Sequence, residues 1–331
     1  MDSQKRGALL LEDQNLISKS DYNKWVTLGI ALLYALILMN LPFSSFKDRL
    51  NYINYATNSS AILSSYLARG VVDLLVNEPL WLLINIVLAF LLSPENVVRA
   101  IIFLSAFLFS YTFLRANPEK VIWLILFLLL PQVLKNYTTH LRQGLAISVF
   151  FVGYFSRKRI VRNSCLAAAP FIHASFFFVW VIILLECIGK KLHFAIDVRV
   201  VNAIISSIVL GISILPTIAW LGARQGYEYS FGTQMETGLG FIFWLCMLML
   251  MIFQGKSYLD KYAIPTFGVI FYLGMYFFLP FAARVFESIL PFVLLALLAL
   301  TGWRKHFAMV ALFVYFIFQW LLGFLRSGPM F

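Results

Sequence analysis

The most informative stretch of this sequence begins Asn136-Tyr137-Thr138-Thr139-His140-Leu141-Arg142-Gln143-Gly144-Leu145-Ala146 and closes Ala167-Ala168-Ala169-Pro170-Phe171-Ile172-His173-Ala174-Ser175. An apolar run and the basic turn Arg157-Lys158-Arg159 lie between the two motifs. Arg142 thus opens a hydrophobic helix, and His173 sits inside the next apolar run. Charged and imidazole groups are costly in such surroundings, so both side chains are candidates for a functional role. The plainer alternative is that Arg142 snorkels to an interface and His173 bonds a neighbouring helix.

The composition is typical of a membrane protein. The chain has 331 residues, of which 61% are hydrophobic and 12% charged, about half the charged fraction of a soluble domain. Apolar runs of roughly 15 to 25 residues follow one another with short polar breaks, as in polytopic helical membrane proteins. We expect an all-α integral membrane protein with about 11 hydrophobic segments, some of them broken or re-entrant. A single transmembrane domain is expected at 25–326, between a cytoplasmic tail at 1–24 and a short tail at 327–331.

The net charge of +11 does not indicate nucleic-acid binding. The basic residues cluster in short turns between apolar runs, where the positive-inside bias places them. Some of this excess can meet anionic lipid or a diphosphate headgroup. The three cysteines are scattered without the paired spacing of metal ligands, so we expect neither a metal site nor a disulfide framework.

The basic turns also indicate an orientation. With these turns in the cytoplasm, residues 44–77 and 222–237 become the larger periplasmic loops. Within the first loop, residues 61–69 can form an amphipathic helix at the membrane interface. Pro170 and His173 are expected to break the apolar run at 167–185 into two half-spans, which membrane proteins tolerate where a polar cavity is lined.

Three arginines then fall on the outer side, against the positive-inside bias. They are Arg142, Arg224 and Arg284. The nearby acids, Glu228 and Glu287, are too few to pair with all of them. The arginines therefore need a further anionic partner, and a planar guanidinium fork matches diphosphate oxygens well.

Several motifs resemble those of EpsG-type polysaccharide polymerases. Glu78-Pro79-Leu80-Trp81-Leu82-Leu83-Ile84-Asn85 resembles the family's Glu-Pro-aromatic-x-x-x-Asn signature. His140-Leu141-Arg142-Gln143-Gly144-Leu145-Ala146 resembles its Arg-Gln-x-x-Ala helix start, and Phe171-Ile172-His173-Ala174-Ser175 its Phe-x-His-x-Ser turn. The segment with Asp48, Tyr52 and Tyr55 resembles the first outer loop, and Arg284 a late family arginine. The resemblance covers most of the chain between residues 48 and 291, but 197–255 matches nothing in the family.

The resemblance implies a Wzy-like enzyme with a GT-C-like membrane architecture in the bacterial inner membrane. Such enzymes join undecaprenyl-diphosphate-linked oligosaccharide repeats into O-antigen, capsule or exopolysaccharide at the periplasmic face. The expected partners are the lipid-linked donor and acceptor, membrane lipid and a Wzz-like chain-length regulator. No cofactor is expected, because the family is expected to need neither a nucleotide sugar nor an obligatory metal.

The expected chemistry is glycosyl transfer through an oxocarbenium-like transition state. Arg142 and Arg284 are the first candidates for stabilising the charge that develops on the diphosphate. His173 is the best candidate for removing the proton of the acceptor hydroxyl. Asp48, Glu78 and Glu228 are alternative bases, although Glu78 is equally well explained as a helix N-terminal residue.

Further residues are expected to contact the substrate: Gln143, Arg224, Asp48, Tyr52, Glu78, Tyr227 and Glu228. Tyrosines of this set can stack on sugar faces, although tyrosine is common at membrane interfaces in any case. Two rival functions stay open. One is a transporter or flippase of the lipid-linked repeat, which would need the same arginines. The other is a different membrane transferase, either an O-antigen ligase or a sugar O-acyltransferase.

Overall fold

The structure is a computed structural model, and it describes residues 21–46, 48–220 and 238–325. All regular structure in this part of the chain is helical, which confirms the all-α expectation. The chain divides into two compact units. Of the described residues, the first unit contains 21–174 (apart from residue 47) and 318–325, and the second contains 175–220 and 238–317.

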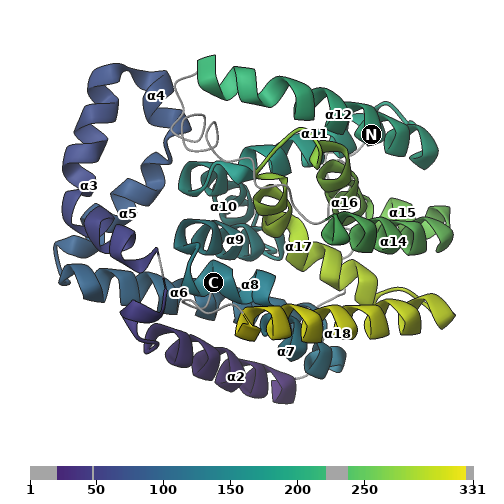
Figure 1. Cartoon of the computed structure of the whole chain (residues 1–331), viewed down its shortest axis with the longest axis horizontal. Helices are drawn as coiled ribbons and strands as arrows, with labels where there is room; N and C mark the ends of the chain where they lie inside the picture. Colours follow the sequence, from purple (N-terminus) through teal and green to yellow (C-terminus); the bar gives the residue numbers. More distant parts are fainter. Residues whose placement is uncertain (1–20, 47, 221–237, 326–331) are drawn as a thin grey trace. The chain divides into compact units, whose positions relative to one another are not determined.

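In its described residues up to Ala174, the first unit has nine α-helices, of which α3 lies against α5 and α6, and α9 lies between α6 and α10 (Figure 1). Their bounds are α2 (Asp21–Met39), α3 (Arg49–Arg69), α4 (Val71–Val76), α5 (Pro79–Ala89), α6 (Pro94–Ala116), α7 (Val121–Leu128), α8 (Pro131–Thr138), α9 (Leu141–Tyr154) and α10 (Arg159–Ile172). Two short 3-10 turns, η3 (Phe43–Ser45) and η4 (Pro118–Lys120), connect them.

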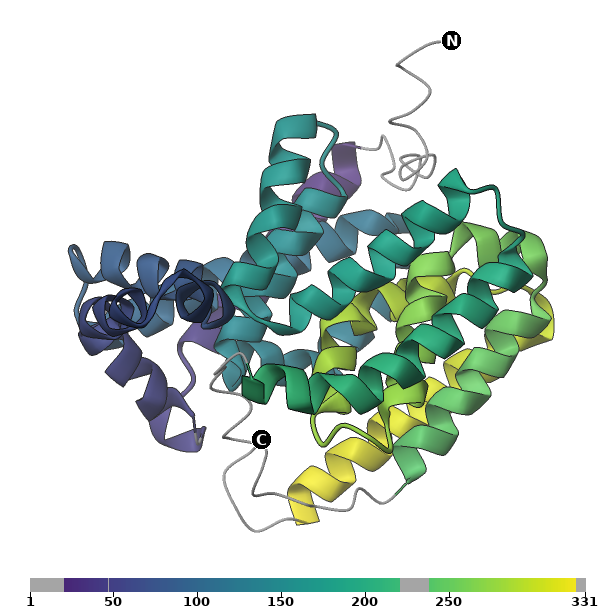
Figure 2. The same cartoon turned by 90° about the horizontal axis from the view of Figure 1, so that it is seen from above.

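In the second unit, α16 packs against α12, α17 and α14. The helices are α11 (Ser175–Lys191), α12 (Ile196–Trp220), α14 (Leu239–Phe253), α15 (Lys256–Lys261), α16 (Ala263–Met275), α17 (Ala282–Leu298) and the first part of α18 (Gly302–Leu325). Helices α14 and α18 lie side by side (Figure 2), where the rings of Phe243 and Tyr315 stack with centroids 4.3 Å apart.

Three helices of the described chain are long and apolar enough to cross a membrane. They are Pro94–Ala116, Ile196–Thr217 and Gly302–Gly323. A fourth crossing results if the segments Pro118–Leu128 and Pro131–Thr138, bent by 72°, are taken as one broken span. Other apolar helices are shorter, at 10–17 residues. The structure thus supports the character of a membrane protein, and the number of eleven segments stays a prediction.

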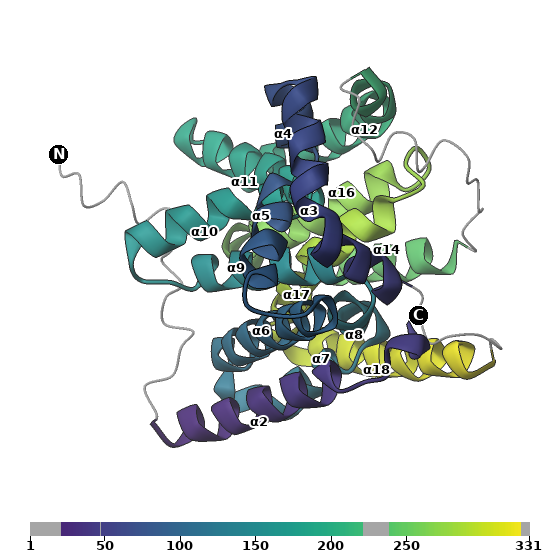
Figure 3. The ribbon, with the colours of Figure 1, turned by 90° about the vertical axis from the view of Figure 1, so that its left-hand side faces the viewer.

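The expected loop at 44–77 is largely helical, which corrects the sequence interpretation. Helix α3 begins at Arg49 rather than near residue 61, and α4 follows it after Gly70 (Figure 3). The buried residues of α3 are Arg49, Tyr52, Ala56 and Ser59. Their spacing of three and four residues forms one helical face. Because that face mixes polar and aromatic side chains, it lacks the apolar periodicity by which a helix is recognised in a sequence.

The corner between α8 and α9 is closely packed. The apolar run at 121–134 breaks at Pro131, because proline cannot donate the hydrogen bond that would continue α7. Helix α8 then returns against α9, where a Cβ on Gly144 would lie 1.9 Å from the carbonyl oxygen of Asn136. The two backbones are therefore in direct contact one turn after the start of α9, which determines where Arg142 is held.

Arg49 connects three segments of the first unit. Its side chain is completely buried. It donates hydrogen bonds to the carbonyls of Leu38 at 3.4 Å, Leu41 at 2.6 Å and Thr138 at 3.2 Å. Unpaired carbonyls at the ends of helices carry partial negative charge, so a cation is stabilised there. Burial nevertheless lowers the pKa of Arg49 to about 10, with a further contribution from the charge of Arg99.

A second buried arginine connects three helices of the second unit. Arg199 of α12 bonds Glu186 of α11 at 2.5 Å and also pairs with Asp260 of α15. Lys190 lies 3.2 Å from the same oxygen of Glu186. A Cβ on Gly189 would lie 2.7 Å from the Arg199 side chain, so glycine there leaves room for the arginine. Removing one partner from a buried network of this kind is strongly destabilising.

Gly144→Ala is predicted to destabilise the first unit. The added methyl group meets a backbone oxygen that cannot rotate away, and overpacking of this kind costs about 1–3 kcal/mol or more. The thermal unfolding temperature of the purified protein measures the effect. Gly29→Ala in α2 is the matched control, because no atom lies within 4 Å of the added Cβ. Equal unfolding temperatures for the two variants would contradict the close packing.

Arg49→Lys is also predicted to lower the unfolding temperature. Lysine keeps the positive charge but lacks the planar fork that reaches three carbonyls at once. Each buried carbonyl left without a donor costs about 1–3 kcal/mol. The control is Arg69→Lys, whose side chain is 58% exposed. A shift no larger than that of the control would rule out the proposed role of Arg49.

Candidate functional site

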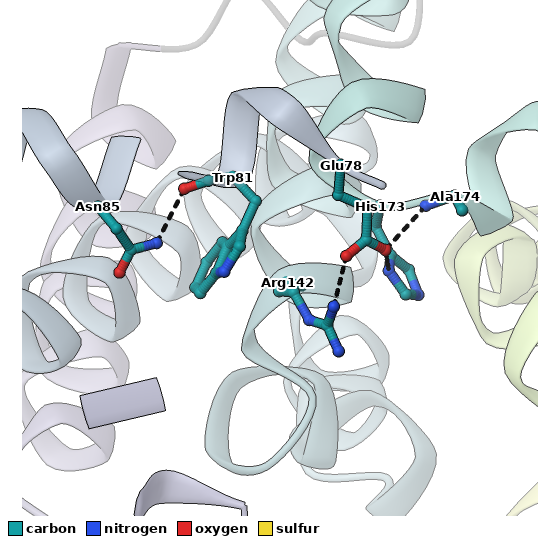
Figure 4. A network of polar contacts seen from close by, with 6 residues as sticks. All are labelled: Glu78, Trp81, Asn85, Arg142, His173 and Ala174. Carbon is teal, nitrogen blue, oxygen red and sulfur yellow. Dashed lines mark hydrogen bonds and ion pairs between the residues drawn. The ribbon is translucent and has the colours of Figure 1, made fainter. Parts of the chain in front are cut away.

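Three of the sequence motifs meet at the carboxylate of Glu78 (Figure 4). Its Oε2 accepts a hydrogen bond from Nη1 of Arg142 at 2.5 Å. Its Oε1 lies 2.7 Å from Nδ1 of His173 and accepts the Ala174 N–H at 3.2 Å. The arginine is 64 positions and the histidine 95 positions away in the sequence. All these residues belong to the first unit.

Helix ends bring these groups together. Pro79 is the first residue of α5, so Glu78 is the residue before a helix start. Arg142 is the second residue of α9. Helix α10 contains Pro170 and ends at Ile172, which places the expected break at His173 and Ala174 instead of at the proline. His173 is extended, with φ −149° and ψ 124°, and this conformation lets the next N–H reach Glu78.

The backbone of Glu78 is held in an unfavourable conformation. Its φ of 60° and ψ of 54° lie in the left-handed region, where a residue with a side chain is uncommon. The side chain makes no capping bond to α5. The plain explanation of Glu78 as a helix N-terminal residue therefore does not describe its contacts, which go to Arg142, His173 and Ala174.

The environment keeps Glu78 ionised. The side chain is 3% exposed, against 19% for Arg142 and 20% for His173. Burial by itself raises the pKa of Glu78, but the charges of Arg142 and His173 and the hydrogen bonds from His173 and Ala174 lower it, to about 2. Glu78 lies outside the three helices that are long enough to cross a membrane. A buried carboxylate is thus fully ionised at neutral pH, with a partially exposed cation and imidazole attached to it.

An aromatic cluster borders the carboxylate. The Cζ of Arg142 lies 5.4 Å from the centroid of the Tyr55 ring. The rings of Tyr52 and Tyr55 meet Trp81 edge-on, at 5.6 and 6.2 Å. Tyr52 is 5% exposed, so it packs in the core beside the site, while Tyr55 is more accessible. Asn85 donates to the carbonyl of Trp81 at 2.8 Å, an intrahelical contact within α5.

The structure also describes several of the other predicted residues. Gln143 is buried in α9 next to Arg142, and Asp48 precedes α3 without making a side-chain cap. Arg284 is exposed in the first turn of α17, in the second unit. Arg224, Tyr227 and Glu228 lie outside the described residues. Within the described chain, no group of three or more His, Cys, Asp or Glu side chains could hold a metal ion.

The acid that pairs with Arg142 differs from those considered in the sequence. Only Glu228 and Glu287 were counted there as acids near the outer arginines, whereas the structure pairs Arg142 with Glu78. Sequence reasoning also missed Arg49 and the Ala174 N–H. The signal for Arg49 was its position three residues before Tyr52, because the two share a helical face. No sequence signal indicates a backbone N–H contact to a carboxylate far away in the chain.

Comparison with family models, with curated proteins and with solved structures finds no significant match to this chain.

The stability of the protein is predicted to fall at acid pH through Glu78. A carboxyl whose pKa is lower in the folded protein stabilises the fold above its unfolded pKa, here near 4.5, and this stabilisation is lost as the pH falls towards about 2. The loss is on the order of a few kcal/mol. Unfolding temperatures between about pH 7 and pH 3 measure it. In Glu78→Gln the unfolding temperature should change less with pH than in wild type. In Glu95→Gln, at an exposed position of α6, it should change with pH as in wild type.

Proposed function

We propose that this protein is a membrane glycosyltransferase of the Wzy type. It joins undecaprenyl-diphosphate-linked oligosaccharide repeats into a polysaccharide at the periplasmic face of the bacterial inner membrane. One observation carries the proposal: a single buried carboxylate binds the arginine of one family-like motif and the histidine of another. Motifs that lie far apart in the sequence and meet at one point are the arrangement expected of a functional site.

Arg142 is assigned to the diphosphate of the donor. A guanidinium carries five N–H donors in a planar fork, so one side chain can hold Glu78 and a phosphate oxygen together. Charge accumulates on the diphosphate as the glycosidic bond breaks, and a fixed cation lowers the energy of that state. The bond to Glu78 provides the fixed position. Arg284 is retained as a second arginine of the proposal on two sequence arguments, which are the resemblance and its expected position on the outer side.

His173 is assigned to the acceptor. Its ring is partially exposed and held at one nitrogen by Glu78, as a general base must be. Tyr55, the more accessible ring beside Arg142, is the aromatic side chain best placed to meet a sugar. The remaining parts of the proposal, which are the lipid-linked donor and acceptor and a chain-length regulator, rest on the resemblance.

Ladder formation by purified protein tests the function. The substrate is a synthetic undecaprenyl-diphosphate repeat, supplied without nucleotide sugar. Wild type should produce a ladder of products. Arg142→Ala should lower the rate about 10²–10³-fold, as removal of one transition-state donor does. His173→Ala should lower it about 10²–10⁴-fold. Arg157→Ala, in an exposed turn, is the matched arginine control.

The same variants separate the rival functions in cells. Loss of a polymerase leaves single repeats, loss of a ligase leaves long chains on the lipid carrier, and loss of a flippase traps repeats on the cytoplasmic side. A single unchanged band from folded wild type with its cognate repeat would rule out the polymerase. A ladder made equally well by Arg142→Ala and His173→Ala would remove both residues from the chemistry.

A further inference from the structure

The bond between Glu78 and His173 has a defined direction. Either partner of a carboxyl–imidazole contact can carry the proton, and coordinates alone do not show which does. Oε1 of Glu78 already accepts the Ala174 N–H, and Oε2 accepts from the Arg142 guanidinium. A carboxyl with a pKa of about 2 carries no proton at neutral pH, so it can only accept. Nδ1 of His173 must therefore be the donor.

The direction of that bond determines the chemistry of the ring. A neutral imidazole has one N–H and one nitrogen with a free lone pair. With the proton on Nδ1, the lone pair is on Nε2, at the opposite edge of the ring. We propose that Glu78 is a positioning residue that holds His173 in its Nδ1–H tautomer, so that Nε2 removes the proton of the acceptor hydroxyl. The inference rests on the proposed function for the identity of that hydroxyl.

The transfer step balances with these groups alone. The acceptor oxygen forms a bond to the anomeric carbon of the donor sugar, and the bond from that carbon to the diphosphate oxygen breaks. The electron pair of the broken bond goes to the diphosphate. The hydroxyl proton goes to Nε2 of His173 and later to water. Glu78 and Arg142 together are neutral, so the site gains one positive charge as the leaving group gains negative charge.

The backbone of Glu78 is consistent with this role. A left-handed conformation at a residue with a side chain costs about 1–2 kcal/mol, and it persists where the surroundings hold it. Glycine would adopt this conformation without strain. The strained residue is the one whose carboxylate contacts Arg142, His173 and Ala174 together. These contacts hold the backbone of Glu78 in the left-handed conformation.

Glu78→Gln tests the tautomer directly. The guanidinium only donates and its bond is charge-assisted, so the amide oxygen is expected to face Arg142. The amide nitrogen then faces His173, and the Ala174 N–H loses its acceptor. The amide N–H then donates to Nδ1, which moves the ring proton to Nε2 and removes the basic lone pair. Holding the histidine in the wrong tautomer lowers kcat by about 10⁴ in the best-studied hydrolase triad. The bond to Arg142 remains, so KM for the lipid-linked repeat should change little.

The readout is nitrogen NMR of protein labelled with ¹⁵N-histidine, at alkaline pH where an ordinary imidazole is neutral. The chain has four histidines, and the signal missing from His173→Gln assigns the one of interest. Wild type should show the proton on Nδ1, and Glu78→Gln should show it on Nε2 with kcat reduced. Glu95→Gln should resemble wild type in both measurements.

The outcomes separate the two proposals. An Nε2–H signal for His173 in wild type overturns the positioning role, even if Glu78→Gln does not fold. A switched tautomer with unchanged kcat overturns its part in catalysis. A switched tautomer in a protein that makes no ladder keeps the positioning of His173 by Glu78 and removes the polymerase.

Discussion

The charge of Glu78 is the constraint around which the described site is built. A carboxylate that is 3% exposed cannot be solvated by water, so both its oxygens must be satisfied by the protein. Arg142, His173 and the Ala174 N–H do this, and they come from the ends of different helices. Loss of one partner from a buried ion pair leaves an uncompensated charge and costs about 3–5 kcal/mol. The carboxylate therefore both stabilises this corner of the first unit and holds the Arg142 and His173 side chains in fixed positions.

Three partly or fully buried arginines are stabilised by different kinds of partner. Arg49 donates to carbonyl oxygens, lies over an aromatic ring and is 0% exposed. Arg199 has two carboxylates and is 6% exposed. Arg142 is 19% exposed and bonds the carboxylate of Glu78, which also contacts His173. The first two are suited to joining helices, whereas Arg142 is the most exposed of the three and its carboxylate partner also contacts an imidazole. This difference favours Arg142 as the functional arginine of the three.

Close backbone packing makes the site possible. The bend at Pro131 brings α8 back against α9, and Gly144 allows the two backbones to touch. Arg49 ties the end of α8 to the loop after α2. Arg142 lies half a turn before Gly144 in α9, so its position follows from this contact. The polar residues of the site thus depend on a glycine and an arginine that take no part in the proposed chemistry.

The sequence alone was enough to predict the helical fold class, the membrane character and the motifs with Glu78, Arg142 and His173, because these depend on composition and on short-range patterns. It also located the helix starts at Pro79 and Leu141, and of the two residues expected to break the run at 167–185, Pro170 and His173, the helix ends before His173. It did not reveal that α3 begins at Arg49, because the buried face of that helix is not apolar. Nor did it reveal the partners of Glu78, since contacts across 64 and 95 positions depend on how helices pack. A pattern of residues can indicate which side chains are costly to bury, but only the packed helices determine which charges meet.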